Sequence, residues 1–134
     1  MIKHARILLL AVLALALTVA AAAQAKPARV ATTVTVTAGK PTEFGFKLST
    51  KTVTHGSVTF SVKNSGTVPH DFKVCSASVK SDAANSCKGH GTAMLSPGQS
   101  AKLTVTLAKA GKYEYLCTVA GHAIAGMKGI LTVK

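Results

Sequence analysis

From about residue 30 onward, apolar and polar positions alternate with a period of two, which is typical of half-buried β-strands. Val34 and Val36 alternate with threonines, and Leu103, Val105 and Leu107 repeat the pattern further along the chain. The same alternation predicts further strands over residues 44–48, 58–62, 72–74, 113–117 and 129–133. After the first 25 residues the sequence has no helical period, although a short turn of helix over 78–85 is compatible with its composition.

Turn-forming residues separate these segments at short intervals. Asn64-Ser65-Gly66 follows one predicted strand, and Ser96-Pro97-Gly98-Gln99 has Pro and Gly where a type II turn requires them. Seven or eight short strands with turns between them predict one all-β domain, a Greek-key antiparallel β-sandwich or barrel.

Residues 1–25 have the composition of a signal peptide. Lys3 and Arg6 form a basic start, an apolar run follows, and Ala23-Gln24-Ala25 matches a signal-peptidase site. We therefore expect an exported protein that is periplasmic, extracellular or at the cell surface, and whose mature domain comprises residues 26–134. The alternative is an uncleaved membrane anchor, because about 17 apolar residues is close to the shortest span of a bilayer.

Basic residues greatly outnumber acidic ones, with 16 Lys and Arg against four Asp and Glu. Lys3 and Arg6 precede the mature domain, so fourteen basic residues remain and its formal charge is +10. In an exported protein this charge favours acidic redox partners, or peripheral contact with an anionic membrane, over nucleic acid. The four acids are too far apart for a carboxylate-pair hydrolase or a calcium cage. We expect a monomer.

One loop near the C-terminus carries the candidate chemistry. Cys117, His122 and Met127 follow a predicted strand with the spacing Cys-x4-His-x4-Met. Thiolate, imidazole and thioether form a soft ligand set that suits copper, and Cys with two His and a distant Met is the arrangement of blue-copper centres. Gly121 and Gly126 allow backbone conformations that other residues resist, so one loop can present three ligands.

Such a site needs one more histidine, which we expect from the opposite sheet. His70 begins a predicted strand, where Pro69 stiffens the chain and Phe72 anchors it in the core. His55 lies in a Thr-rich turn and His90 lies between two glycines, so both are interpreted as surface histidines. His70 is the predicted ligand.

Two motifs contain these candidate ligands. They are Pro69-His70-Asp71-Phe72 and Gly111-x-Tyr113-x-Tyr115-x-Cys117-Thr118-x2-Gly121-His122-x3-Gly126-Met127-x-Gly129. Together they resemble the plastocyanin/azurin family of cupredoxins, with the ligand spacing of auracyanin-like bacterial members, and the resemblance covers essentially the whole mature chain. It implies one type 1 copper centre, Cu(II)/Cu(I), in which His70, Cys117 and His122 lie near one plane and Met127 is the long axial ligand.

Asp71 departs from this family, which usually has Asn after its first ligand histidine. In the family that side chain ties the first ligand strand to the cysteine loop, so Asp71 should accept hydrogen bonds from loop amides or from Thr118. If it is ionised, its charge favours oxidised copper and lowers the reduction potential.

Three cysteines in an exported chain suggest one disulfide and one unpaired thiol. Cys75 and Cys87 flank an irregular stretch of 11 residues that a bridge would tether. Cys117 is then left free to bind a metal.

The predicted function is one-electron transfer between redox proteins, and not catalysis. The sequence shows no open substrate position and no His-x-His motif for the second copper centre of a multicopper oxidase. The alternative is a copper-handling protein that delivers metal.

The loop around His122 consists of small or apolar residues, namely Val119, Ala120, Ala123, Ile124 and Ala125. They predict an uncharged surface patch around the edge of the His122 ring. The alternative is that the loop is apolar because it packs on the end of the barrel.

Overall fold

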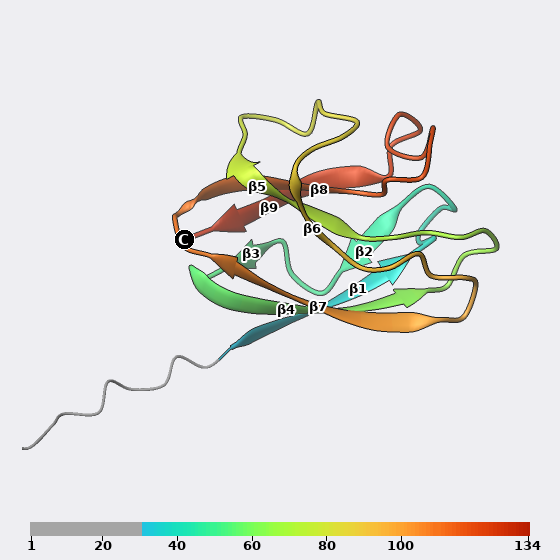
Figure 1. The fold of residues 1–134 in the computed structure, drawn as a ribbon, viewed down its shortest axis with the longest axis horizontal. Helices are drawn as coiled ribbons and strands as arrows, with labels where there is room; N and C mark the ends of the chain where they lie inside the picture. Colours follow the sequence, from blue (N-terminus) through green and yellow to red (C-terminus); the bar gives the residue numbers. More distant parts are fainter. Residues whose placement is uncertain (1–30) are drawn as a thin grey trace, which may run out of the picture.

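A computed structural model describes residues 31–134, which form two β-sheets packed face to face (Figure 1). The described residues contain no α-helix, so the predicted all-β sandwich is confirmed. Among residues 31–134, no helical segment has the length and apolar character needed to cross a membrane. The signal peptide predicted for residues 1–25 lies outside the described residues.

The first sheet has four strands in the order β2-β1-β4-β7, and the second has five in the order β3-β9-β8-β5-β6. The strands of the first sheet are β1 (Thr32–Ala38), β2 (Phe46–Leu48), β4 (Gly56–Asn64) and β7 (Ser100–Leu107). Those of the second are β3 (Thr52–Val53), β5 (Lys73–Ser78), β6 (Gly89–Gly91), β8 (Gly111–Leu116) and β9 (Lys128–Val133).

The sheets depart from the sequence prediction in three details. β1 pairs with β4, and β3 with β9, in parallel, so the sheets are mixed and not purely antiparallel. The first parallel pair arises because the chain crosses to the second sheet at β3 before it returns as β4. β3 and β6 were not predicted, because two or three residues are too few to show a period. The short helix allowed over residues 78–85 is absent.

The apolar positions of the alternating strands meet between the two sheets. The residues of this main core include Val34, Val36, Val58, Phe60, Val62, Phe72, Val74, Val105, Leu107, Tyr115, Leu131 and Val133. Phe72 lies at its centre, with ring centroids 5.2 Å from Phe46, 5.2 Å from Phe60 and 5.5 Å from Tyr115. Aromatic pairs of this kind contribute about 0.5–1.5 kcal/mol each beyond the area they bury. Phe72 thus fixes the chain two residues after His70, as the sequence predicts.

A disulfide links Cys75 to Cys87, as predicted, with their Cα atoms 5.6 Å apart. The bridge belongs to a small apolar cluster with Leu116 and Ala123. Lys128 also contacts this disulfide loop, since its Nζ lies 3.3 Å from the carbonyl oxygen of Ala84 and 3.1 Å from Oδ1 of Asn85. The loop is therefore tied to the sheet by a covalent link, apolar packing and one lysine.

Candidate metal centre

The loop between β8 and β9 is closed on itself by backbone hydrogen bonds. The amide of Cys117 donates to the carbonyl of Met127 (3.0 Å), and the amide of Met127 donates to the carbonyl of His122 (2.9 Å). Gly121 and Gly126 have φ angles of +85° and +108°, a region that side chains disfavour, although a Cβ at either position would meet open space. Backbone conformation, as predicted, accounts for both glycines.

His70 approaches the same point from the loop between β4 and β5. Its backbone pairs with Leu95 through two hydrogen bonds of 3.0 and 2.8 Å. The buried side chain of Asn64 donates to the carbonyls of Leu95 and Val68, both at 2.8 Å, and so holds this loop in place. The prediction that His70 comes from the opposite sheet is wrong, because the following strand, β5, pairs with β8 within one sheet. The chain reaches the site by a loop over the end of the sandwich.

The structure brings the predicted ligands together. Nδ1 of His70 lies 3.2 Å from Nδ1 of His122, and Sγ of Cys117 lies 3.5 Å from the same atom. One ligand atom from each of these three residues lies within 4.8 Å of the others. His70, Cys117 and Met127 are completely buried, and Met127 packs in one cluster with Cys117. One thiol, two imidazoles and one thioether therefore share the end of the sandwich.

Burial shifts the pKa of two of these groups. It raises the pKa of the Cys117 thiol to about 11. Burial, and then the neighbouring His70, lowers the pKa of His122 below its ordinary 6.5. Without metal the thiol thus keeps its proton and His122 is a neutral imidazole, so a metal that binds here must displace the thiol proton.

Asp71 has the contacts that the sequence predicts. Its Oδ1 accepts a hydrogen bond of 2.6 Å from the amide of Thr118, and its Oδ2 accepts one from the hydroxyl of Thr118. Asp71 is buried, with 7% of its surface exposed. The residue after His70 therefore anchors the residue after Cys117.

Sequence reasoning missed two residues of the loop between β1 and β2. Glu43 Oε1 lies 2.9 Å from Nε2 of His70, and the ring of Phe44 lies 4.9 Å from that of His122. Phe44 was predicted to lie in a strand, but the strand begins at Phe46 and the Phe44 side chain is exposed. Glu43 gave no local signal beyond being one of only four acids.

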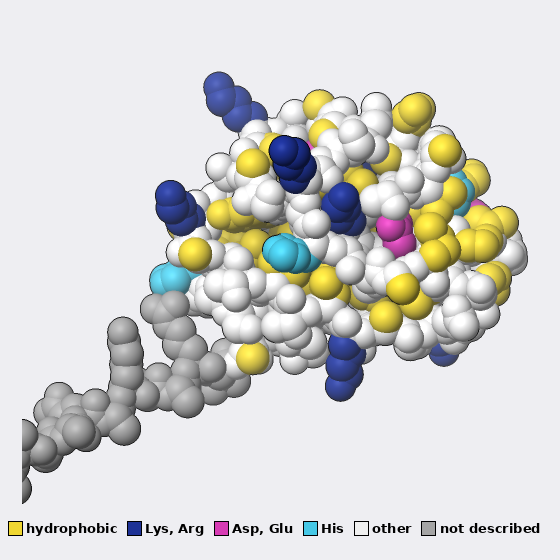
Figure 2. Space-filling model, in the orientation of Figure 1, with side chains coloured by type: hydrophobic (Ala, Val, Ile, Leu, Met, Phe, Trp, Pro, Cys, Tyr) yellow, Lys and Arg dark blue, Asp and Glu magenta, His cyan; other side chains and the backbone are white. Residues whose placement is uncertain are grey.

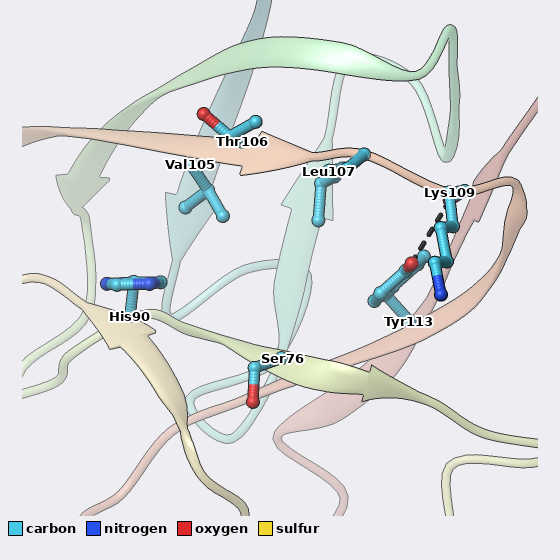
Figure 3. A pocket seen from close by; sticks show the side chains of 8 residues that line it. Ser76, His90, Val105, Thr106, Leu107, Lys109 and Tyr113 are labelled. Atoms are coloured by element: carbon cyan, nitrogen blue, oxygen red, sulfur yellow. Dashed lines mark hydrogen bonds between the residues drawn. The ribbon is translucent and has the colours of Figure 1, made fainter.

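The other two histidines of the described chain lie outside the cluster. His55 Nδ1 is 3.0 Å from the carbonyl oxygen of Lys134, and His90 is exposed on β6. His90 lines a separate groove of about 320 Å³ between β6 and β7, the edge strands of the two sheets (Figure 3). Tyr113 also lines it and donates to the carbonyl of Lys109. The groove contains none of the predicted ligands.

A family comparison agrees with this geometry. Residues 32–134 match the family described as copper binding proteins, plastocyanin/azurin family. The chain belongs to this family. Within it, His70, Cys117, His122 and Met127 are arranged as a type 1 copper site.

Solved structures of blue copper proteins share the fold of this plastocyanin/azurin family member. Reduced auracyanin from Roseiflexus castenholzii is 28% identical, with a TM-score of 0.60 over 78% of this chain and 98% of that one. Rusticyanin from Thiobacillus ferrooxidans is 25% identical, with a TM-score of 0.59 over 76% of each chain.

Two curated relatives match a shorter segment. Auracyanin-B of Chloroflexus aurantiacus is 52% identical over 42 residues, which is 31% of this chain and 18% of that protein. The copper-resistant cuproprotein CopI of Pseudomonas aeruginosa is 49% identical over 41 residues, which is 31% of this chain and 23% of that protein. The matched segments thus cover less than a quarter of either relative.

Proposed function

We propose that this protein is an exported one-electron carrier whose type 1 copper is held by His70, Cys117 and His122, with Met127 as the axial ligand. Copper, when bound, supplies the one-electron Cu(II)/Cu(I) couple. The observation that carries the proposal is the convergence of one thiol and two imidazole nitrogens within 4.8 Å in a largely buried site. The loops that present these groups are fixed by backbone hydrogen bonds, which favours a geometry that changes little between redox states.

The absorption spectrum after addition of Cu(II) tests the metal site. We expect an intense thiolate-to-copper charge-transfer band, which Cys117→Ser abolishes. Met127→Leu should keep the colour and raise the reduction potential, because it removes a weak axial donor. His55→Ala and His90→Ala are matched controls that should change neither. A weak d–d band alone, or a strong band that survives Cys117→Ser, contradicts the assignment.

A copper-handling role is the second candidate, supported by the similarity to the copper-resistant cuproprotein CopI. The two roles differ in whether electrons or copper ions leave the site faster. A carrier should exchange electrons with a redox protein much faster than it loses Cu(I) to an excess of chelator. A delivery protein should lose copper at least as fast as it exchanges electrons. Stopped-flow measurement of both rates on one sample separates the two functions.

The exposed apolar surface supports electron entry near His122. The large apolar side chains that stand exposed in the described chain are Phe44, Val68, Met94 and Ile124, all in loops. Phe44 contacts the His122 ring, Val68 and Met94 lie near the His70–Leu95 pair in sequence, and Ile124 is in the ligand loop. Figure 2 shows hydrophobic side chains gathered at the right-hand end of the molecule, whereas Lys and Arg are dispersed. An apolar patch suits the small interfaces of transient redox encounters.

One loop residue differs from the predicted patch. Ala123 is buried, with 3% of its surface exposed, and packs on the disulfide cluster, so it does not contribute to the surface. Ala125 and Ile124 are exposed and provide the test. Ala125→Glu and Ile124→Glu should slow electron transfer to a partner without changing the copper spectrum. If both leave every transfer rate unchanged, electrons enter elsewhere.

The partner is proposed to be an acidic redox protein that the lysines steer at long range. Salt screens such steering beyond about 8–10 Å. Added salt should therefore slow transfer to an acidic partner, but leave self-exchange between two positively charged molecules unchanged or faster. A transfer rate that does not depend on salt contradicts steering.

Export is supported by the Cys75–Cys87 disulfide, because such bonds persist in oxidising compartments. We propose that the mature protein is a monomer that begins at Lys26, with peripheral contact to an anionic membrane as a secondary expectation. Mass spectrometry of the exported protein tests the first residue. An intact leader indicates a membrane anchor.

A further inference from the structure

Glu43 lies against the side of the His70 ring that faces away from the other ligands. Its Oε1 is 2.9 Å from Nε2 of His70, while Nδ1 of His70 is 3.2 Å from Nδ1 of His122. The two nitrogens of one buried imidazole therefore have different neighbours. One faces a carboxylate, and the other faces the candidate metal ligands.

The surroundings of Glu43 show that it acts as an ionised acceptor. Oε1 accepts from the amides of Thr67 (2.9 Å) and Val68 (3.2 Å), and Oε2 accepts from the amide and the hydroxyl of Thr67, both at 3.0 Å. These donors point at both oxygens of Glu43, and a proton on either oxygen would lie against a donor hydrogen, so the ionised carboxylate is favoured. An ionised carboxylate has no proton to give, and Nε2 of His70 must then be the donor in their contact.

Gly66 makes this approach of Glu43 to His70 sterically feasible. A Cβ on Gly66 would overlap Oε1 of Glu43 and lie 2.9 Å from Nε2 of His70. Gly66 is not among the residues with positive φ, so close approach and not backbone conformation explains a glycine here. The turn that follows β4 thus leaves room for a side chain from the loop between β1 and β2.

We propose that Glu43 is a positioning residue of the copper centre: it holds His70 in the Nε2–H tautomer and places a negative charge beside the metal. The tautomer leaves Nδ1 of His70 unprotonated and directed at the other ligands. A carboxylate that accepts from the far nitrogen of a ligand histidine fixes the ring and raises its basicity. The charge favours Cu(II) over Cu(I) and so lowers the reduction potential. This inference rests on the proposed copper-binding function.

Two substitutions of Glu43 separate its effect on the orientation of the His70 ring from the effect of its negative charge. Glu43→Gln keeps an acceptor oxygen of similar shape but removes the charge, and Glu43→Ala removes both. Asp82→Asn is the matched control, because it removes one negative charge from the exposed disulfide loop. The measurements are the reduction potential, the Cu(II) affinity by chelator competition, and nitrogen NMR of the His70 ring in metal-free protein.

Glu43→Gln should raise the reduction potential by more than Asp82→Asn does, and His70 should stay in one tautomer. Glu43→Ala should raise the potential as well, weaken Cu(II) binding by about 10–100-fold, and give a mixture of tautomers. The proposal is overturned if the potential of Glu43→Gln shifts no more than that of the control, or if Glu43→Ala keeps both the tautomer and the affinity. Absence of a blue band in the unaltered protein would sink the proposed function instead, and the NMR of metal-free protein would still decide the role of Glu43.

Discussion

The loops around the metal centre and the outer face of the five-stranded sheet each contain a glutamate, and the two carboxyl groups differ in hydrogen bonding and in the direction of their pKa shift. Glu43, with 29% of its side chain exposed, is surrounded by donors, and the hydrogen bond to His70 followed by those to Thr67 lowers its pKa to about 2. Glu114 is completely buried, and neither of its carboxylate oxygens has a hydrogen-bond partner among the described residues. Burial raises the pKa of Glu114, and the charge of Lys128 and the backbone of Ala84 offset this rise only in part.

This difference shows that the two regions are stabilised by different kinds of interaction. The metal end is fixed by polar side chains that cross between loops, namely Asn64, Glu43 and Asp71, each with its hydrogen bonds made. The face under the disulfide loop is fixed by a covalent bridge and apolar contacts, and it tolerates one unpaired acid. Substitutions in the first region should therefore change the metal site, whereas those in the second should change stability alone.

Asn64→Ala should cause the largest loss of unfolding free energy. Its side chain makes three hydrogen bonds, two as donor to Val68 and Leu95 and one as acceptor from the amide of Gly66 at 2.9 Å. At about 1 kcal/mol for each, the variant should lose about 3 kcal/mol of unfolding free energy. Its Cu(II) affinity should also fall, because the loop that carries His70 loosens. Urea unfolding and chelator competition measure the two losses.

The control is Asn85→Ala, an exposed asparagine of the disulfide loop. It loses one exposed hydrogen bond, from Nζ of Lys128, so the unfolding free energy should fall by no more than about 1 kcal/mol while copper binding stays intact. If Asn64→Ala lost stability but kept the affinity of the unaltered protein, the polar contacts would not position the ligand.

Removal of the disulfide should have the next largest effect. Replacing both Cys75 and Cys87 with Ala should lower the unfolding free energy by about 2–3 kcal/mol, as expected for a loop of this length. The copper absorption band should not change, because the four candidate ligands are held by other contacts. A shifted band in the double variant would show that the disulfide cluster also shapes the ligand loop, through Ala123.

Glu114→Gln should have a smaller effect that depends on pH. Because burial raises the pKa of Glu114 above its ordinary 4.5, the folded protein retains this proton at a pH where the unfolded chain has lost it. The native protein therefore loses stability as pH rises from about 4.5 through the folded pKa. The Gln variant lacks this loss and should be more stable by on the order of 1 kcal/mol at neutral pH.

Urea unfolding of both proteins from about pH 4, just below the ordinary pKa of 4.5, up to about pH 8 checks this difference. The difference in unfolding free energy between the two proteins should be small at about pH 4 and should grow toward neutral pH. A constant gap would mean that Glu114 ionises normally and that its burial has no energetic consequence.

The parts of the molecule that sequence predicts well are those whose information is local. Cys117, His122 and Met127 lie in one loop, so their spacing already encodes the site, and the alternation in β4 and β7 encodes which face is buried. Glu43 could not be found this way, because its contact with His70 joins two loops 27 residues apart. The parallel pairing of β1 with β4 is likewise set by a crossing between sheets that no local pattern records.

Asp71→Asn should have the smallest effect on stability and the clearest effect on the potential. Asn can accept from the amide of Thr118 through its oxygen and donate to the hydroxyl through its nitrogen, so both links between the two ligand segments survive. The charge assistance is lost, and the cost should stay below about 1 kcal/mol. Loss of one negative charge near the ligands should nevertheless raise the reduction potential. Voltammetry of this variant beside Asp82→Asn checks the sign, and a potential that rises no more than that of the control would mean that the side chain of Asp71 does not act on the copper through its charge.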